Sequence, residues 1–407
     1  MTVGEETNFD LIVVGAGLVG ATCALSLASG GNGELNIALI EAGPETAQPN
    51  LANFDPRVVA LTPHSQALFQ RLGVWQDMVS QRVSPYQDMF VWDAEGTGHI
   101  SFNAQQVQQA CLGHIVENSV ALAAIMNTVE QHPAITIIRP ARVKQLMLPS
   151  ETQTQVLVIL ESGETVKGSL LVAADGANSK LRSLANLPTR EWAYGQKAIV
   201  TSVQTTESHQ RTAYQRFLSS GPLAFLPLQD DRDQGTSSSI VWSADEALAD
   251  RMMALSDEEF CETLGEAFEH RLGEVTHVDK RFCIPLIQRH AIDYFTPGMA
   301  LVGDAAHTLH PLAGQGVNLG LLDSEVLTNE ILRAHQRSIP FGETQILRRY
   351  QRQRKAGNLG MMGMMEGFKR LFASDELGVR YLRNAGMKRL DHWPLLKNTI
   401  IRQAMGL

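Results

Sequence analysis

The stretch Asp10-Leu-Ile-Val-Val-Gly-Ala-Gly-Leu-Val-Gly20 decides the fold of this 407-residue chain. It opens with a short apolar run typical of a buried strand, and a helical stretch rich in Ala, Leu and Ser follows the glycines to about Ala28. In the pattern G-x-G-x-x-G, Gly15 allows the tight turn, Gly17 lets a pyrophosphate approach the backbone, and Gly20 lets helix and strand pack closely. The sequence therefore predicts a strand, a glycine turn and a helix whose N-terminal amides hold the phosphates of a dinucleotide.

A second strand supports the dinucleotide interpretation. Asn36-Ile-Ala-Leu-Ile40 is apolar and is followed by Glu41, 21 residues beyond Gly20. A carboxylate at this distance accepts hydrogen bonds from the ribose hydroxyls of an adenosine. A lone G-x-G-x-x-G is a weak signal because glycine turns are common, but here the strand, the helix and the acid agree. The pattern leaves FAD and NAD both open, whereas an acid at position 41 disfavours the 2′-phosphate of NADP.

Two further segments combine a strand with an acid at its carboxyl end. Leu170-Leu-Val-Ala-Ala-Asp-Gly176 breaks at Asp-Gly and continues through a polar turn to Arg182. Ala300-Leu-Val-Gly-Asp304 leads into a loop rich in Pro and Gly and then into a long helix from about Gln315. Acids at the carboxyl ends of parallel strands lie in the crevice where open α/β sheets bind ligands.

With these three motifs the chain resembles the class A, single-component FAD-dependent aromatic hydroxylases, the group that includes para-hydroxybenzoate hydroxylase. The glycine fingerprint, the Asp-Gly motif and the Gly-Asp motif occur in the family's order, at residues 15–20, 175–176 and 303–304. Several stretches resemble the ubiquinone-biosynthesis branch, namely 57–61, 72–75, 113–118, 224–228, 303–320 and 401–407. Residues 113–118 and the last seven are most similar to the 2-octaprenylphenol 5-hydroxylases. The methoxybenzoquinol hydroxylases of the same pathway are close behind, so the ring position stays open.

The resemblance implies an α/β fold. A Rossmann-like FAD-binding domain of the para-hydroxybenzoate hydroxylase type carries an inserted antiparallel-sheet substrate domain and a C-terminal helical region. The expected parts are 1–75, 105–187 and 284–340 for the discontinuous FAD-binding domain, 76–104 and 188–283 for the substrate domain, and 341–407 for the helical region. Alternating runs between Trp192 and Cys283 are typical of antiparallel strands and agree with this division.

The resemblance also implies which residues hold FAD. Asp304 is expected to hydrogen-bond the ribityl chain, and the loop after it is expected to approach the isoalloxazine ring. Asp175 and Gly176 are expected to hold the cofactor from the opposite side, and Arg57 to lie near the pyrophosphate or the ring. The complete expected set is Gly15, Gly17, Gly20, Glu41, Arg57, Asp175, Gly176, Gly303, Asp304, Pro311, Gly314, Gly316, Val317 and Asn318.

In this family the chemistry belongs to the flavin. The resemblance implies that reduced FAD and O2 form a C4a-hydroperoxyflavin, which hydroxylates a phenol ring while the protein excludes water. NAD(P)H is one candidate electron donor, and another reductant is the alternative. NAD(P)H would have to bind transiently, because no second nucleotide fingerprint occurs in the sequence. No catalytic side chain is required. Several residues are candidates for the substrate pocket, and the alternative for each is a role in packing. The pocket candidates are His114, Tyr194, Tyr214, Phe225 and Pro311.

The charges are distributed unevenly along the chain. The net charge of −9 argues against general nucleic-acid binding, which requires a basic surface. Residues 333–407 contain fifteen Lys and Arg against five Asp and Glu, so the first 332 residues carry −19. One interpretation is that this basic region rests on anionic lipid and that Met361–Phe372 admits a polyprenyl chain. The alternative is a basic face packed on an acidic body, with the methionines filling the core.

Other signals narrow the class of protein. The four cysteines are isolated, which is typical of buried thiols in a reducing cytosol. His307 and His310 have no third ligand of matching pattern, so no metal site is predicted. Leu11–Gly33 is uncharged, but its glycines and the acids before it argue against a membrane span or a signal peptide. We therefore expect a cytoplasmic protein that is at most peripheral to the inner face of the membrane.

Three functions stay open on the sequence. The first is a flavin monooxygenase that acts on a polyprenylated phenol or quinol, either as a homo-oligomer or within a quinone-biosynthesis complex. The second is an FAD-dependent reductase or oxidase of an isoprenoid substrate, since a fold alone does not determine the reaction. The third is a non-catalytic subunit of such a complex. The match around residues 304–320 favours the first.

Overall fold

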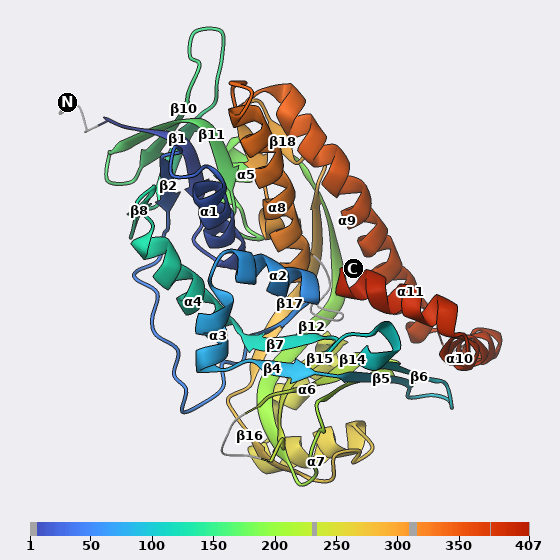
Figure 1. The fold of residues 1–407 in the computed structure, drawn as a ribbon. Coiled ribbons are helices and arrows are strands. Elements are labelled where there is room, and N and C mark those ends of the chain that lie inside the picture. Colours follow the sequence, from blue (N-terminus) through green and yellow to red (C-terminus); the bar gives the residue numbers. More distant parts are fainter. Residues whose placement is uncertain (1–5, 230–233, 309–315, 375, 407) are drawn as a thin grey trace.

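The computed structural model describes residues 6–229, 234–308, 316–374 and 376–406. Within these ranges the chain builds two large β-sheets, a small third sheet and a set of C-terminal helices (Figure 1). The predicted α/β class, with a parallel sheet and an antiparallel sheet, is confirmed.

The first sheet is built around a parallel core. Its strands are β1 (Glu6–Val14), β2 (Ile37–Ile40), β8 (Ile135–Ile138), β9 (Val143–Met147), β10 (Val156–Leu160), β11 (Thr165–Ala173), β18 (Phe295–Thr296) and β19 (Met299–Leu301). Strand β1 lies between β11 and β2 with both pairings parallel, and β19 and β8 extend the parallel core on either side. Leu11, Ile12 and Val13 are fully buried, as expected for a parallel strand covered on both faces.

A layer of helices covers this sheet. The helices in this layer and beside it are α1 (Leu18–Gly30), α2 (Pro63–Arg71), α3 (Trp75–Gln81), α4 (Asn118–Gln131), α5 (Lys180–Leu184) and α8 (Gly316–His335). Helix α1 packs between α4 and α8 and is buried around most of its circumference (Figure 1). This burial explains why residues 11–33 carry no charge. Among the described helices, none combines the length and the hydropathy that a membrane span requires.

The second sheet is mostly antiparallel, and its strands run in the order β20-β17-β12-β15-β14-β13-β5-β6, with β16 beside β12. Their bounds are β5 (Asp88–Asp93), β6 (His99–Asn103), β12 (Thr189–Thr205), β13 (Thr212–Leu218), β14 (Gly221–Pro227), β15 (Ser237–Asp245), β16 (Val275–Val278), β17 (Phe282–Ala291) and β20 (His307–Thr308). Helices α6 (Glu246–Ala254) and α7 (Asp257–Ala267) pack on one face, where they enclose a second hydrophobic core that includes Trp242 and Phe260.

The third sheet joins the two large ones. It consists of β3 (Val58–Leu61), β4 (Ser84–Tyr86) and β7 (Gly113–Glu117), with β7 in the middle. Its residues Ala60 and Ile115 pack on Leu228, which follows β14 of the second sheet. The two large sheets are therefore connected through a shared apolar contact.

Two expected domain limits differ from the sheet pairing. The limit at residue 284 falls inside β17, which stays hydrogen-bonded to β12 as far as Ala291. Strand β4 falls within 76–104, the expected substrate segment, yet it pairs with β7 of the third sheet. The first difference arises because the hydrogen-bonded strand β17 continues across residue 284, and the second because a short strand inside one sequence segment pairs with a strand outside it.

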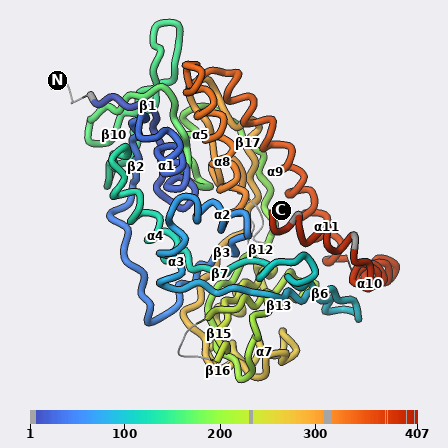
Figure 2. The backbone as a smooth tube through the Cα atoms, in the orientation of Figure 1, coloured from blue at the N-terminus to red at the C-terminus, as the bar shows by residue number. Residues whose placement is uncertain are grey.

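The C-terminal region is helical, with α9 (Thr344–Ala373), α10 (Leu377–Asp391) and α11 (Pro394–Met405). Two short 3-10 helices, η1 (Ala104–Val107) and η2 (Gly303–Ala305), complete the described structure. Helix α10 packs on β6, and α11 packs on η1. Figure 2 shows the end of the chain returning toward α2, where Gly406 lies against His64. The C-terminal helices are thus attached to both large parts of the molecule.

A buried ion pair fastens α10 to the second sheet, and it makes a testable prediction. Arg383 Nε donates to Asp93 Oδ2 at 2.8 Å and Nη2 donates to Oδ1 at 2.9 Å, with both side chains 1% exposed. We expect Arg383→Gln to lower the free energy of unfolding by about 3 kcal/mol or more, because the Asp93 charge stays buried without its partner. Arg380→Gln is the matched control on the same helix, since its partner Glu95 is exposed, and should cost below about 1 kcal/mol. Urea unfolding of both variants tests this, and equal losses would contradict it.

Candidate functional site

The three glycines of the turn after β1 differ in how closely other atoms pack on them. A Cβ on Gly15, whose φ is +102°, would lie 2.4 Å from the Ala174 carbonyl oxygen. A Cβ on Gly20 would lie 1.9 Å from the Gly15 carbonyl oxygen. A Cβ on Gly17 would meet no atom of the described residues within 4 Å. Gly15 and Gly20 are therefore required by packing, whereas Gly17 leaves the backbone open to a ligand.

The start of α1 is suited to an anion. Gly17 is the N-cap residue, so no side chain caps the helix, and the first turn holds no acidic residue. The first amides of a helix have no partner within the helix, and the helix dipole makes this end positive. A pyrophosphate that approaches Gly17 would meet these amides directly.

Glu41 lies across the glycine turn, directly after β2. Its Oε2 accepts a hydrogen bond from the Ala16 amide at 2.6 Å, and its Oε1 accepts one from the Gly43 amide at 2.7 Å. These bonds hold the carboxylate beside the phosphate cradle. Each carboxylate oxygen keeps a second lone pair, so the group can also accept ribose hydroxyls.

The Asp-Gly motif follows β11, the parallel neighbour of β1. Asp175 Oδ2 accepts a hydrogen bond from the Leu181 amide at 3.1 Å, whereas Oδ1 is buried and accepts none from the described residues. Gly176 has φ +80° and faces open space. An orphaned buried carboxylate oxygen beside an open glycine fits a donor supplied by a bound ligand.

The Gly-Asp motif follows β19, the next parallel strand. Gly303 has φ +61°, and Asp304 is exposed to solvent although protein surrounds it closely enough that burial raises the pKa of its carboxyl. Such a side chain lies in a recess rather than on an open surface. Gly303 and Gly320 both abut Val19 of α1, where a Cβ would come within 3.1 and 2.7 Å of the Val19 side chain. The recess therefore opens beside the glycine turn.

Arg182 links the two acidic motifs, a role that the sequence did not reveal. It is 7% exposed, and its Nη1 donates to the Ala305 carbonyl at 2.8 Å while Nη2 donates to the Ala177 carbonyl at 3.0 Å. The loop after β11 is thereby tied to η2. All three motifs thus meet at one edge of the parallel sheet, the edge at which open α/β sheets bind ligands.

The other predicted cofactor residues differ in their availability. A Cβ on Gly316, at the start of α8, would meet no atom of the described residues within 4 Å, and Val317 packs partly against the core of the first sheet. The Asn318 side chain is committed to the protein, because it donates to the Ala60 carbonyl at 2.7 Å and accepts bonds from the β3–α2 connection. Arg57 precedes β3, is exposed and makes no side-chain bond to the described residues. Pro311, Gly314 and His310 lie outside the described residues.

Two of the predicted pocket residues pack in or against the core of the second sheet. Phe225 is 1% exposed and stacks on Phe268 with 3.7 Å between ring centroids. Tyr214 pairs with Phe225 across the strands and meets Phe268 edge-on at 6.0 Å. Both side chains point into the core beneath α7, because the alternation along β13 and β14 turns them to that face.

The other two described pocket candidates do not change protonation state near pH 7. His114 lies against Trp75 and 3.6 Å from Cys111 Sγ, and burial lowers its pKa to about 4. Tyr194 donates its hydroxyl hydrogen bond to Gln288, and burial raises its pKa to about 12. His114 is therefore neutral and Tyr194 protonated near pH 7, and both contribute packing and orientation. Within the described part of the chain, no group of three metal-ligating side chains occurs.

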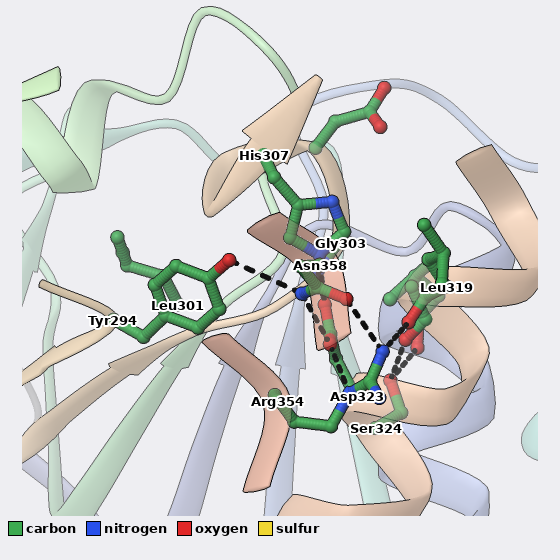
Figure 3. Close-up of polar contacts among 12 residues, drawn as sticks. Tyr294, Leu301, Gly303, His307, Leu319, Asp323, Ser324, Arg354 and Asn358 are labelled. Carbon is green, nitrogen blue, oxygen red and sulfur yellow. Dashed lines mark hydrogen bonds and ion pairs between the residues drawn. The ribbon is translucent and has the colours of Figure 1, made fainter. Parts of the chain in front are cut away.

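A buried polar cluster, which the sequence motifs did not predict, lies behind the Gly-Asp turn (Figure 3). We call it the Asp323 cluster, and its members are His307, Asp323, Arg354 and Asn358. One signal pointed to it, since Asp323 is an acid within the otherwise uncharged turn Leu321-Leu-Asp-Ser324 of α8. Its partner Arg354 comes from α9, which no local pattern connects to α8.

Comparisons with known proteins agree with this geometry. The FAD binding domain family matches residues 8–360. The 3-demethoxyubiquinol 3-hydroxylase of Escherichia coli is 34% identical over 400 residues, which cover 98% of this chain and 98% of that protein. Ubiquinone hydroxylase UbiL of Rhodospirillum rubrum is 34% identical over 406 residues, 100% of this chain and 91% of that protein. The solved structure of p-nitrophenol 4-monooxygenase PnpA from Pseudomonas putida covers 98% of this chain and 99% of that chain with a TM-score of 0.77 and 19% identity, which is a likeness of fold.

The contrast between Gly17 and Gly20 predicts two different failures. We expect Gly17→Ala to change the free energy of unfolding by no more than about 1 kcal/mol, because the new Cβ meets no protein atom. The same Cβ would stand where the pyrophosphate approaches, so the dissociation constant of FAD should rise about tenfold or more. Gly20→Ala should instead destabilise the apoprotein, since its Cβ would collide with the Gly15 carbonyl.

Flavin fluorescence titration and urea unfolding separate these two failures. A Gly17→Ala variant that binds FAD as tightly as the wild-type protein would contradict the assignment of the phosphate cradle.

Proposed function

The chain belongs to the FAD binding domain family, and on that premise we propose that it is an FAD-dependent monooxygenase that hydroxylates a polyprenylated phenol or quinol in ubiquinone biosynthesis. The observation that carries the proposal is the meeting of the three motifs at one sheet edge, in a chain that is 34% identical over nearly its whole length to named ubiquinone hydroxylases. The reductase and the non-catalytic subunit are not favoured by these relatives.

Different groups of the described residues suit different parts of FAD. The amides at Gly17 and the start of α1 suit the pyrophosphate, and Glu41 suits the adenosine ribose. Asp304 suits the ribityl chain, and the Asp175 oxygen that accepts no bond from the described residues suits a donor on the opposite side. When bound, FAD supplies the redox chemistry that activates O2 for transfer of one oxygen atom to an aromatic ring. The protein's part is to bind, orient and exclude water.

The substrate activates itself in this proposal. A phenol or quinol ring is electron-rich, so it requires no protein nucleophile or paired acid. The neutral His114 and the protonated Tyr194 agree with a site that orients rather than titrates. We propose NAD(P)H as the electron donor. Its binding would be transient, because the sequence holds a single glycine fingerprint and FAD uses it.

Deletion of the gene distinguishes the two ring positions at which the substrate could be hydroxylated. Residues 113–118 favour a 5-hydroxylase, whereas the relative from Escherichia coli is named for hydroxylation at position 3. We expect deletion of the gene to cause accumulation of a polyprenylated precursor that lacks one ring oxygen, identified by mass spectrometry of the lipid extract. Accumulation of a polyprenylphenol indicates the 5-position and accumulation of a demethoxyubiquinol indicates the 3-position. Unchanged ubiquinone and intermediates would exclude the pathway.

The molecule also presents a face that suits a bilayer. Helices α10 and α11 stand at the periphery of the fold (Figure 2). The most exposed large apolar side chains of the described chain lie on α10 or between it and α11. They are Leu377 at 81%, Tyr381 at 75%, Leu382 at 70% and Trp393 at 58% exposed. The exposed Lys388, Arg389 and Arg402 stand on the same two helices and make no ion pair with the described residues. An apolar surface with basic neighbours is the composition of an interfacial membrane contact.

The lipid contact expected of Met361–Phe372 extends to this face. Within that stretch the side chains of Met362, Met365 and Phe372 are buried, whereas those of Met364, Phe368 and Leu371 are 43%, 43% and 38% exposed, less than the side chains on α10. We therefore propose that α10 and α11 rest on the inner face of the membrane, where a polyprenylated substrate resides.

Vesicle flotation tests the membrane contact. We expect the wild-type protein to float with vesicles that contain anionic phosphatidylglycerol, and a Leu382→Ser/Trp393→Ser variant to be recovered about tenfold less, because apolar area is lost from the contact. Trp192→Ser is the matched control, since Trp192 is 48% exposed on β12, and it should float as the wild type does. Equal flotation of all three proteins, or none by the wild type, would overturn the proposal.

A further inference from the structure

The Asp323 carboxylate holds both ends of the Gly-Asp turn. Its Oδ2 accepts a hydrogen bond from the Gly303 amide at 3.1 Å and contacts His307 Nε2 at 2.5 Å (Figure 3). Asp304 lies between these two anchors. The direction in which Asp304 enters the recess therefore depends on a carboxylate that does not itself reach the recess, since Asp323 is fully buried.

The other oxygen of the same carboxylate is held by α9. Asp323 Oδ1 accepts hydrogen bonds from Arg354 Nε at 2.7 Å and from Asn358 Nδ2 at 3.3 Å. Arg354 Nη2 also donates to Asn358 Oδ1 at 2.8 Å, which orients the amide. Every member of the cluster is buried, so each bond acts in surroundings where an unmet charge is costly.

Charge compensation within the cluster keeps Asp323 ionised. Burial alone would raise the pKa of this carboxyl, but His307 and Arg354 together hold it below its usual value. An ionised Asp323 accepts bonds on both oxygens at once, which a protonated carboxyl does less well. Removal of Arg354 would therefore weaken the bonds to the turn as well as the bond to α9.

We propose that Arg354 and His307 are positioning residues for FAD, which act through Asp323 to hold the Gly-Asp turn in the shape that presents Asp304 to the ribityl chain. Neither side chain is directed into the recess, since Arg354 is 6% and His307 1% exposed. The inference rests on FAD binding, which the family match supports, and is independent of the proposed substrate.

The extent of the family match agrees with this role. The match ends at residue 360, two residues beyond Asn358, although α9 continues to Ala373. The first half of α9 thus belongs to the FAD-binding unit and the second half lies with the C-terminal helices. A purely structural role for the Arg354 pair is the alternative, and the buried Arg383–Asp93 pair provides a reference for it.

The test compares Arg354→Gln with Arg383→Gln in the full-length protein. Both substitutions break an equally buried arginine–carboxylate pair, but only the first lies behind the Gly-Asp turn. At a temperature at which circular dichroism shows both variants folded, we expect Arg354→Gln to raise the dissociation constant of FAD about tenfold and Arg383→Gln to change it less than about twofold. The visible absorption band of bound flavin should change in the first variant alone.

ADP separates local from global effects. It carries the pyrophosphate and the adenosine but no ribityl chain, so its affinity should be unchanged in Arg354→Gln. Equal loss of FAD affinity in the two arginine variants, or parallel loss of FAD and ADP affinity in Arg354→Gln, would overturn the proposal.

His307 variants provide the decision if Arg354→Gln does not fold. The side-chain amide of Gln occupies nearly the position of Nε2 and can still donate to Asp323, whereas Ala cannot. We expect His307→Gln to bind FAD within about twofold of the wild-type protein and His307→Ala to bind about tenfold more weakly. If both variants bind FAD equally well or equally poorly, the hydrogen bond to Asp323 does not position the turn.

Discussion

The close approach of α1 to β11 and to the turn at residues 303–305 is the constraint on which the site depends. Gly15 and Gly20 leave room for Ala174, and Gly303 and Gly320 leave room for Val19. A Cβ at any of these four glycines would come within 3.1 Å of a protein atom. Because these contacts align the carboxyl ends of three parallel strands, motifs that are far apart in the sequence form one recess.

The site combines polar groups that are hydrogen-bonded within the protein with groups that have no partner among the described residues. A Cβ on Gly17 or Gly176 would meet no atom of the described residues within 4 Å, and one oxygen of Asp175 is buried without a partner among those residues. The groups behind them are fully committed, since Arg182 ties the two acidic motifs together and the Asp323 cluster holds the turn. A fixed frame with unmet polar groups on its inner side is what preorganised binding of a charged cofactor requires. The C-terminal region contributes to this frame through the first half of α9.

The local parts of this arrangement were predictable from the sequence, and the long-range parts were not. The strand, the glycine turn and the helix at residues 10–28 follow from short patterns of residue type, as does Glu41 after β2. The buried face of each strand was not predictable, because alternation along a strand does not show which of its two faces packs on a core. Phe225 and Tyr214 illustrate this, since both pack in or against the second core. Asn318 was expected to serve the flavin, but its amide joins α8 to β3. The pairing of Asp323 with Arg354 spans two helices and has no sequence signal of its own.

The central claim is that this sheet edge holds a flavin that transfers one atom of O2 to a phenol ring. A single-turnover experiment with ¹⁸O2 tests it most directly. The holoenzyme is photoreduced without oxygen, mixed with a short-chain prenylated phenol and ¹⁸O2, and the product is examined by mass spectrometry. The account predicts a hydroxylated phenol that carries one ¹⁸O atom. Reoxidation of the flavin with an unchanged phenol, or a product whose oxygen comes from water, would contradict it.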